Sequence, residues 1–240
     1  MFVILIFIKY NYYLLLFKYI IINIIFINYY LNILLTLFLM LGSNYKIVII
    51  GESMVGKTSI LLRYIKGKFI KVEERTINTN CFKKTISINN LIFEINIWDT
   101  AGEEKYHAMA PIFYRGADGA VITFDFTRKE TFEKAQKWFE ELNQFSENNP
   151  KIILVGNKYD LNNKCVTGDE ARKLAKKYNA IFLSVSALTG ENVNEIFTSL
   201  TYEIYQNKIK INKNQNKIKN KNINIVNDNN DNNNSKKCSC

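Results

Sequence analysis

The chain contains few of the residues that commonly bind transition metals. It has one histidine, His107, and four cysteines among its 240 residues. A metal site built from cysteine and histidine ligands is therefore a poor explanation for these residues. Cys81 and Cys165 lie well inside the chain, and we expect them to be reduced thiols of the kind found in cytosolic proteins. The other two cysteines are at the C-terminus.

The first 39 residues contain no Asp, Glu, Arg, Ala, Gly, Pro or Ser. They consist almost wholly of Ile, Leu, Phe, Tyr, Asn and Lys, and residues 19–41 carry no charge. Such a run is long enough to span a bilayer, and it lacks the small-residue cleavage site of a secretory signal peptide. A membrane segment is therefore one interpretation of residues 1–39.

Two lysines and the codon set argue against that interpretation. Lys9 and Lys18 precede the uncharged run, so the positive-inside preference would export the whole chain after it. The six dominant residue types all have codons made only of A and T, as an A/T-rich leader translated in frame would give. Met40 comes directly after this stretch. We therefore prefer a misassigned start for residues 1–39, with the membrane segment as the alternative.

The formal net charge of +10 is concentrated at the two ends of the chain. The residues after Gln206 contain eight lysines and two aspartates, and the first 44 residues contain two lysines and no acidic residue. The part between them is nearly neutral. No basic face accompanies a recognition motif, so nucleic-acid binding is not expected. The hydrophobic content of 48% is enough for one core of ordinary size.

The first motif with clear chemistry is GESMVGKT at residues 51–58. It follows a β-branched apolar run (45–50) that predicts a buried strand, and it precedes a helical pattern at 59–65. This order describes a phosphate-binding loop, because backbone N–H groups and a helix N-terminus both attract phosphate oxygens. Lys57 is expected to reach the outer phosphates, and the Thr58 hydroxyl to coordinate Mg²⁺. A chance glycine turn with a stray lysine is the alternative.

The second motif, DTAGE, begins with Asp99 at the end of an apolar run at residues 91–98. A carboxylate at a strand end beside a phosphate loop can hold Mg²⁺ through water. Gly102 offers a backbone N–H to a γ-phosphate and a flexible joint for the segment after it. Thr76 lies between the two motifs and is expected to complete the metal shell only when the γ-phosphate is present. Alone it would be an ordinary loop threonine, so this role depends on its spacing.

The third motif, NKYD at residues 157–160, comes after an apolar run at residues 151–155. Guanine presents two adjacent N–H donor groups, and the Asp160 carboxylate can accept from both. Adenine lacks this donor pair and would leave the carboxylate unpaired, which predicts GTP rather than ATP as the ligand. The stem of Lys158 can pack on the base while its ammonium group approaches the phosphate loop.

Together these motifs resemble those of the Ras superfamily of small GTPases and, within it, the Rab family. The similarity covers residues 45–206. Its most informative stretch is WDTAGEEKYHAMAPIFYRGADGAVITFDFT at residues 98–127, within which YHAMAPIFYRGA (106–117) is most similar to the early-endosomal branch. The resemblance implies a three-layer α/β P-loop GTPase fold, in which a six-stranded, mostly parallel sheet lies between helices. It also implies two mobile switch segments near residues 72–81 and 101–110.

The resemblance also assigns roles to individual residues. It implies nucleotide contacts from Gly51, Ser53, Met54, Val55, Gly56, Lys57, Thr58, Ser59, Thr76, Gly102, Asn157, Lys158 and Asp160, from Ser186, Ala187 and Leu188 beside the guanine, and from Phe69 at the guanine edge. Thr58, Thr76 and Asp99 form the implied magnesium site. The implied effector surface contains Cys81, Trp98 and Phe113. Lys57, Gly102 and Glu103 are the candidate catalytic residues.

Four positions depart from the family pattern. Glu103 stands where the family has the glutamine that orients the attacking water; a carboxylate can accept from that water but cannot donate to the phosphoryl oxygens, and it adds negative charge. Leu188 replaces a lysine beside the guanine, Asn78 replaces a glycine in the first switch, and Cys81 replaces an effector-surface phenylalanine. We therefore expect hydrolysis that is slow and depends on an activating protein.

Residues 207–235 are dominated by Asn, Lys and Ile without a helical or strand period, which predicts a flexible linker. The chain ends in KKCSC. Rab proteins that end in C-x-C carry geranylgeranyl groups on both cysteines, so the resemblance implies lipid attachment at Cys238 and Cys240. The predicted organisation is thus a leader (1–39), a GTPase domain (40–206) and a disordered tail with a prenylation motif (207–240).

The sequence thus predicts a Rab-type small GTPase that switches between GTP and GDP, with Mg²⁺ as cofactor, in vesicle trafficking. We expect it at the cytoplasmic face of endosomal membranes, held by its lipid anchor. Its expected partners are an exchange factor, a GTPase-activating protein, effectors, and the proteins that prenylate it and extract it from membranes. The alternative is a hydrolysis-impaired, GTP-bound scaffold that recruits effectors without cycling. The NKYD motif disfavours a P-loop ATPase.

Overall fold

The computed structural model describes residues 16–31, 44–71, 79–100 and 110–231 of the chain. Residues 16–31 are helical. After them, in chain order, come β1 (Asn44–Ile50), α2 (Lys57–Lys66), β2 (Asn80–Ile88), β3 (Leu91–Asp99), α3 (Ala110–Tyr114), β4 (Gly119–Asp125), α4 (Lys129–Glu133), α5 (Ala135–Phe145), β5 (Lys151–Asn157), α6 (Gly168–Lys177), β6 (Ile181–Ser184) and α7 (Val193–Asp231).

The strands form one six-stranded sheet in the order β2-β3-β1-β4-β5-β6. β2 runs antiparallel to β3, with Cys81 opposite Trp98, and the other neighbouring pairs are parallel. Parallel neighbours need crossover connections, and the intervening helices supply them. The predicted α/β architecture with a mostly parallel sheet is confirmed.

The apolar runs of the sequence are the central strands of this sheet. β4 is buried along its whole length, and β1 is buried or half-buried from Tyr45 onward. β2, at the edge, alternates instead between exposed and half-buried positions over most of its length. Central parallel strands are covered by helices on both faces, which explains their nearly continuous apolar sequences. The strands expected at 45–50, 91–98 and 151–155 are confirmed as β1, β3 and β5.

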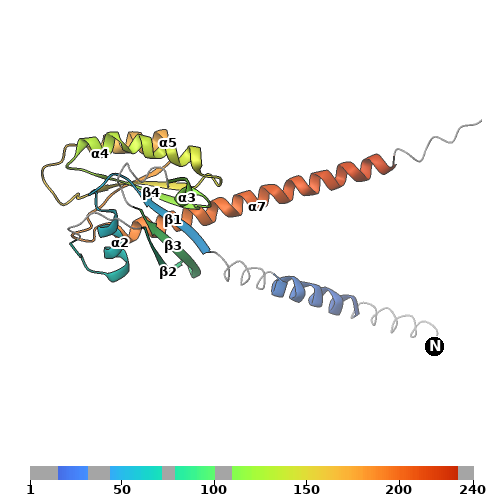
Figure 1. The fold of residues 1–240 in the computed structure, drawn as a ribbon. Helices are drawn as coiled ribbons and strands as arrows, with labels where there is room; N and C mark the ends of the chain where they lie inside the picture. The colour runs from blue at the N-terminus through green and yellow to red at the C-terminus, as the bar shows by residue number, and fades with distance from the viewer. Residues whose placement is uncertain (1–15, 32–43, 72–78, 101–109, 232–240) are drawn as a thin grey trace, which may run out of the picture.

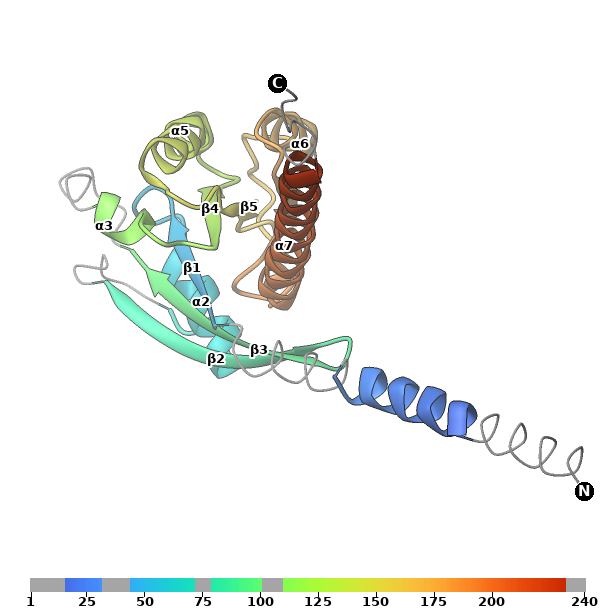
Figure 2. The same cartoon turned by 90° about the vertical axis from the view of Figure 1, so that its right-hand side faces the viewer.

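Each face of the sheet has its own hydrophobic core. On one face lie α2 and α7, where Leu61, Tyr64 and Phe197 are buried, and the rings of Tyr64 and Phe197 stack with centroids 4.0 Å apart. On the other face lie α3, α5 and α6, which bury Phe139 and Ala171 among others. Figures 1 and 2 show α2 and α5 on different sides of the strands. The three layers predicted from the family resemblance are present.

The helix α7 extends well beyond the layered domain. Its first turns pack on the sheet through Phe197 and Leu200, and Figure 1 shows the rest projecting away as a long rod. Residues 207–231 have a helical backbone, where the sequence predicts a flexible linker; the disordered tail stays a prediction. A helix that packing has already nucleated can propagate residue by residue, and this segment contains neither Gly nor Pro to end it.

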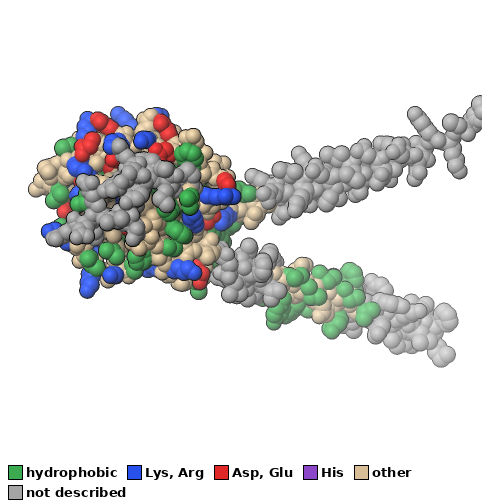
Figure 3. All heavy atoms as spheres, viewed as in Figure 1, with side chains coloured by type: hydrophobic (Ala, Val, Ile, Leu, Met, Phe, Trp, Pro, Cys, Tyr) green, Lys and Arg blue, Asp and Glu red, His purple; other side chains and the backbone are tan. Residues whose placement is uncertain are grey.

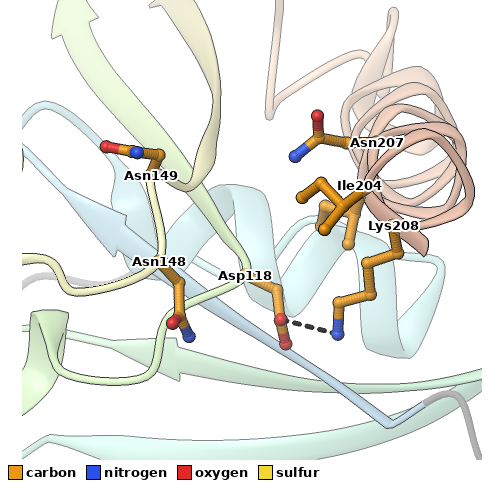
Figure 4. Close-up of a pocket in the computed structure, with 7 residues that line it drawn as sticks. Asp118, Asn148, Asn149, Ile204, Asn207 and Lys208 are labelled. Carbon is orange, nitrogen blue, oxygen red and sulfur yellow. Dashed lines mark ion pairs between the residues drawn. The ribbon is translucent and has the colours of Figure 1, made fainter. Parts of the chain in front are cut away.

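An ion pair fixes α7 to the amino ends of the central strands. Asp118 pairs with Lys208 of α7 at 2.8 Å (Figure 4) and accepts from the backbone N–H of Lys46 at 2.9 Å. The Lys208 ammonium group also lies 4.6 Å from the centre of the Tyr45 ring. Beside this ion pair is a hollow, lined further by Asn148, Asn149, Ile204, Asn207 and Ile211. It lies at the amino ends of β4 and β5.

The helix at residues 16–31 contributes nothing to either core, since every residue in it is exposed. Figure 3 shows its apolar side chains on the molecular surface, apart from the layered domain. Within the described parts of the chain, no helix combines the length and apolarity needed to cross a membrane. The remainder of residues 1–39 lies outside the described residues, so both interpretations of this leader stay predictions.

Candidate functional site

The three sequence motifs meet at one edge of the sheet. GESMVGKT connects β1 to α2, Asp99 is the last residue of β3, and NKYD begins at the last residue of β5. All three therefore lie at the carboxyl ends of parallel strands, and ligands of open α/β sheets bind outside that edge. The site is built by topology from segments that are distant in the sequence.

Two glycines give the loop at residues 51–58 its shape. Gly51 has φ +137° and Gly56 has φ +96°, values that other residues rarely adopt. A Cβ atom at Gly51 would collide with the backbone oxygen of Thr123, and one at Gly56 would collide with the side-chain amide of Asn157. The loop can therefore take this path only with glycine at both positions.

The helix α2 presents an electropositive end at this loop. It begins at Lys57 with no acidic residue in its first turn and no side-chain hydrogen bond at its N-cap. The first N–H groups of a helix lack intrahelical partners, so a phosphate oxygen can accept from them. Thr58 and Ser59, two of the predicted nucleotide contacts, lie in this first turn.

The Lys57 side chain is folded into the loop and nearly fully buried, with 5% exposed. Its ammonium group donates to the carbonyl oxygens of Gly51 and Glu52, each at 2.9 Å. Burial lowers the pKa of Lys57 to about 8, although the nearby carboxylates of Asp99 and Glu52 oppose the shift. Phosphate oxygens beside Lys57 would add further negative charge and favour the charged ammonium form. The buried lysine is thus poised for an anionic ligand.

Thr58 and Asp99 are brought together as predicted for a metal site. The Thr58 hydroxyl donates to Asp99 Oδ2 at 2.6 Å. Asp99 is fully buried, and burial raises its pKa, opposed by the Thr58 hydrogen bond and by Lys57. Among the described residues, its other oxygen, Oδ1, has no hydrogen-bond partner. A hydroxyl and a buried carboxylate with a spare oxygen are the hard ligands that Mg²⁺ prefers, so these residues fit the ion.

The Asn157 side chain joins the phosphate loop to the base-side loops. Its Nδ2 donates to the carbonyl oxygen of Val55 at 2.8 Å, and its Oδ1 accepts from the backbone N–H of Ala187 at 3.1 Å. Asn157 is 2% exposed, so both hydrogen bonds are shielded from water. One amide therefore sets the spacing between the phosphate loop and the loop at 186–188.

Asp160 is positioned by the loop that follows β6. The Ser186 hydroxyl donates to Asp160 Oδ1 at 2.6 Å, and Ser186 also accepts from the backbone N–H of Thr189 at 3.0 Å. Lys158 lies alongside and donates to the carbonyl oxygen of Met54 at 3.1 Å. The structure thus brings the NKYD motif, Ser186 and the phosphate loop together. Leu188, which replaces the family lysine, is 52% exposed.

Sequence reasoning missed a second carboxylate at this edge. Asp125 ends β4, is fully buried, and pairs with Lys158 at 2.6 Å and with Arg128 at 3.3 Å. The sequence did contain a signal for Asp125, because a carboxylate ends an apolar run there, as Asp99 does at the end of β3. Glu52 of the phosphate loop also pairs with Lys134, at 2.9 Å. No local pattern in the sequence marks the pair of Glu52 and Lys134.

Several predicted residues are not tested by these contacts. Phe69 lies after α2 and is 36% exposed, so its contact with guanine stays a prediction. Thr76, Gly102 and Glu103 lie outside the described residues, as do most of the two predicted switch segments. The roles of these three residues at the γ-phosphate stay predictions.

The predicted effector-surface residues lie on β2, β3 and α3. Cys81 is exposed and is the register partner of Trp98 across β2 and β3. Trp98 and Phe113 are partly buried and pack against the same hydrophobic core. The structure therefore brings the two predicted aromatic residues, Trp98 and Phe113, to the same core, and Cys81 lies beside Trp98. The role of these three residues in binding effectors stays a prediction.

Comparison with known proteins agrees with this geometry. The family model of the Ras family matches residues 46–206. The Ras-related protein Rab5 of Nicotiana tabacum is 43% identical over 162 residues, which cover 67% of this chain and 79% of that relative. The Ras-related protein RHN1 of Nicotiana plumbaginifolia is 42% identical over 162 residues, with the same coverage.

The chain therefore belongs to the Ras family. Within that family it is a Rab-type small GTPase of the early-endosomal branch, which binds GTP and hydrolyses it to GDP and phosphate. The assignment of this activity to the phosphate loop, Asp99 and the NKYD motif stays a prediction.

The position of Asp160 generates a prediction about the base. Asp160→Asn should lower the affinity for GTP at least about 100-fold, because the new amide presents a donor to the donor groups of guanine. Xanthosine triphosphate offers an acceptor at that position and should bind the variant better than GTP does. Equilibrium titration with both nucleotides measures the exchange of specificity.

The matched control is Asp169→Asn, which makes the same chemical change on exposed α6. This control should bind GTP as the unchanged protein does. Unaltered GTP affinity in Asp160→Asn would show that Asp160 does not recognise the base.

Proposed function

We propose that this Rab-type GTPase controls endosomal vesicle traffic as a Mg²⁺-dependent, lipid-anchored switch that recruits effectors in its GTP state. The observation that carries the switch is the meeting of Lys57, the Thr58–Asp99 pair and Asn157 at one sheet edge. This arrangement supports one nucleotide that contacts phosphate-side and base-side loops together. A change at its terminal phosphate can then be transmitted to the neighbouring segments.

Mg²⁺ is part of the proposal, with Thr58, Asp99 and Thr76 as the residues that would hold it. When bound, the ion neutralises charge on the β- and γ-phosphates. The Thr58 hydroxyl bonded to Asp99 at 2.6 Å supports this assignment, and so does Asp99 Oδ1, which has no hydrogen-bond partner among the described residues. Lys57 would hold the same phosphates from within the loop.

Glu103 stands where the family has a glutamine, and it is expected to change the rate of GTP hydrolysis. Where a glutamine side chain could both accept from the attacking water and donate to the phosphoryl group, a carboxylate can only accept. Its negative charge also opposes the charge on the γ-phosphate. We therefore propose slow intrinsic hydrolysis that an activating protein accelerates.

This proposal predicts that Glu103→Gln raises the single-turnover rate of GTP hydrolysis by about tenfold, equivalent to about 1.4 kcal/mol of transition-state stabilisation. Phosphate release from bound GTP, with and without a membrane extract that supplies activating protein, measures the rate. Glu104→Gln removes the same charge one residue away and should leave the rate unchanged.

Equal rates for Glu103→Gln and the unchanged protein would contradict the role of Glu103. No hydrolysis by the unchanged protein, even with the extract, would instead favour the non-cycling scaffold. Both outcomes leave GTP binding itself to be measured separately.

The proposed membrane attachment depends on Cys238 and Cys240, which lie outside the described residues. One lipid chain gives only marginal binding to a membrane, and two give stable attachment. The lysines of the tail would add up to about 1 kcal/mol each where they approach an anionic leaflet. The escort and prenylating proteins belong to the same proposal, because two exposed prenyl groups need a carrier in water.

Replacing both Cys238 and Cys240 by Ser, in a chain that starts at Met40, should move the protein from the membrane pellet to the soluble fraction. Either single replacement should leave partial binding that salt weakens. Sedimentation of cell membranes, with and without a salt wash, measures the distribution.

Sedimentation of the double variant after the salt wash would contradict the lipid anchor. If the double variant is soluble from Met40 but stays with membranes when residues 1–39 are included, the leader is a membrane anchor and the misassigned start is wrong.

A further inference from the structure

Two cationic side chains donate to backbone carbonyl groups of the phosphate loop. Arg128 Nη2 donates to the carbonyl oxygen of Ser53 at 2.8 Å, and Lys158 Nζ donates to the carbonyl oxygen of Met54 at 3.1 Å. Met54 has φ +62°, a left-handed conformation that costs a non-glycine residue free energy. The two contacts stabilise the loop where its backbone is least favourable.

The buried carboxylate of Asp125 holds both cations in place. It lies 2.6 Å from Lys158 Nζ and 3.3 Å from Arg128 Nε, while Thr127 donates to it through its backbone N–H at 2.9 Å and its hydroxyl at 2.7 Å. Burial alone would raise the pKa of Asp125, but these hydrogen bonds outweigh burial and keep it below its usual value. The carboxylate therefore stays ionised at neutral pH.

The turn that carries Arg128 is itself tightly bonded. The backbone N–H of Arg128 donates to the Asp125 carbonyl oxygen at 3.0 Å. The Thr131 hydroxyl accepts from the Asp125 N–H at 3.0 Å and donates to the Arg128 carbonyl oxygen at 2.8 Å. Glu130 also lies near the guanidinium, at 3.9 Å. The arginine thus reaches the loop from a fixed base at the end of β4.

Contacts to these carbonyl groups also affect the groups that face a phosphate. Each carbonyl belongs to the peptide unit that carries the N–H of the next residue, Met54 or Val55, and both of these residues are predicted nucleotide contacts. A cation at the carbonyl oxygen polarises that peptide and strengthens its N–H as a donor. The same contact keeps the loop in its binding shape, which reduces the ordering cost of binding.

We infer that Arg128 is a positioning residue that slows the release of bound guanine nucleotide by holding the phosphate loop through Ser53. Arg128 acts from outside the loop and need not touch the nucleotide. The inference rests on nucleotide binding at this loop, which is the core of the proposed function. It adds a determinant of the nucleotide exchange rate.

The test is the dissociation rate of GDP with a fluorescent ribose label, chased with excess unlabelled GDP, in the purified full-length protein with Mg²⁺. Arg128→Met keeps an unbranched, flexible stem but removes the charge and donors, and should raise the rate about tenfold. Arg128→Lys keeps one cation, which can reach Asp125 or the Ser53 carbonyl oxygen but not both, and should give an intermediate rise of about threefold.

The matched control is Arg172→Met on α6, because Arg172 also pairs with an aspartate three residues earlier, Asp169 at 2.7 Å. It should leave the rate within about twofold of the unchanged protein. A rate within twofold in Arg128→Met would overturn the inference.

Failure of the proposed function would look different from failure of the inference. If the unchanged protein and Arg172→Met did not retain labelled GDP at all, the nucleotide site itself would be wrong. Retention by both, with no effect of Arg128→Met, would leave the site intact and overturn the role of Arg128 alone.

Discussion

The side-chain amide of Asn157 is the contact on which the site depends most. It ends β5 and donates to the phosphate loop at Val55, while it accepts from Ala187 on the base side. Gly56 must be glycine because any Cβ there would collide with this same amide. A buried amide with both of its ends bonded has little freedom to move, and each bond would be costly to leave unmade. The distance between phosphate recognition and guanine recognition is therefore set by one residue.

Two charged side chains near that amide, Lys57 and Asp99, are buried in a way that favours ligand binding. Burial lowers the pKa of Lys57 and raises that of Asp99, because removal from water disfavours the charged form of each side chain. Phosphate oxygens would favour the ammonium group, and a metal ion would favour the carboxylate. Bound nucleotide and Mg²⁺ would therefore offset the desolvation cost of the two buried charges. Ligand binding should stabilise the folded protein against unfolding. Asp125 differs because its own hydrogen bonds already favour its ionised form.

Much of this arrangement could be predicted from local sequence. The apolar runs before Gly51, Asp99 and Asn157 gave β1, β3 and β5, because buried parallel strands need apolar residues on both faces. The place of Asp125 at this edge could have been predicted from the apolar run that it ends, but its pairing with Lys158 could not, because Lys158 is distant in the sequence and meets it only through strand pairing. The end of α7 was also missed, since composition argued for a linker while helix propagation from a packed segment favoured a continued helix.

The affinity of Asn157→Ala for GTP and for GDP tests the account most directly. The substitution leaves the Val55 carbonyl oxygen and the Ala187 N–H without their buried partner, so both affinities should fall about 100-fold. Asn163→Ala, at an exposed position of the loop after β5, is the control and should bind both nucleotides normally. Affinities of Asn157→Ala within a few-fold of the control, in a folded variant, would contradict the claim that one amide holds the two halves of the site together.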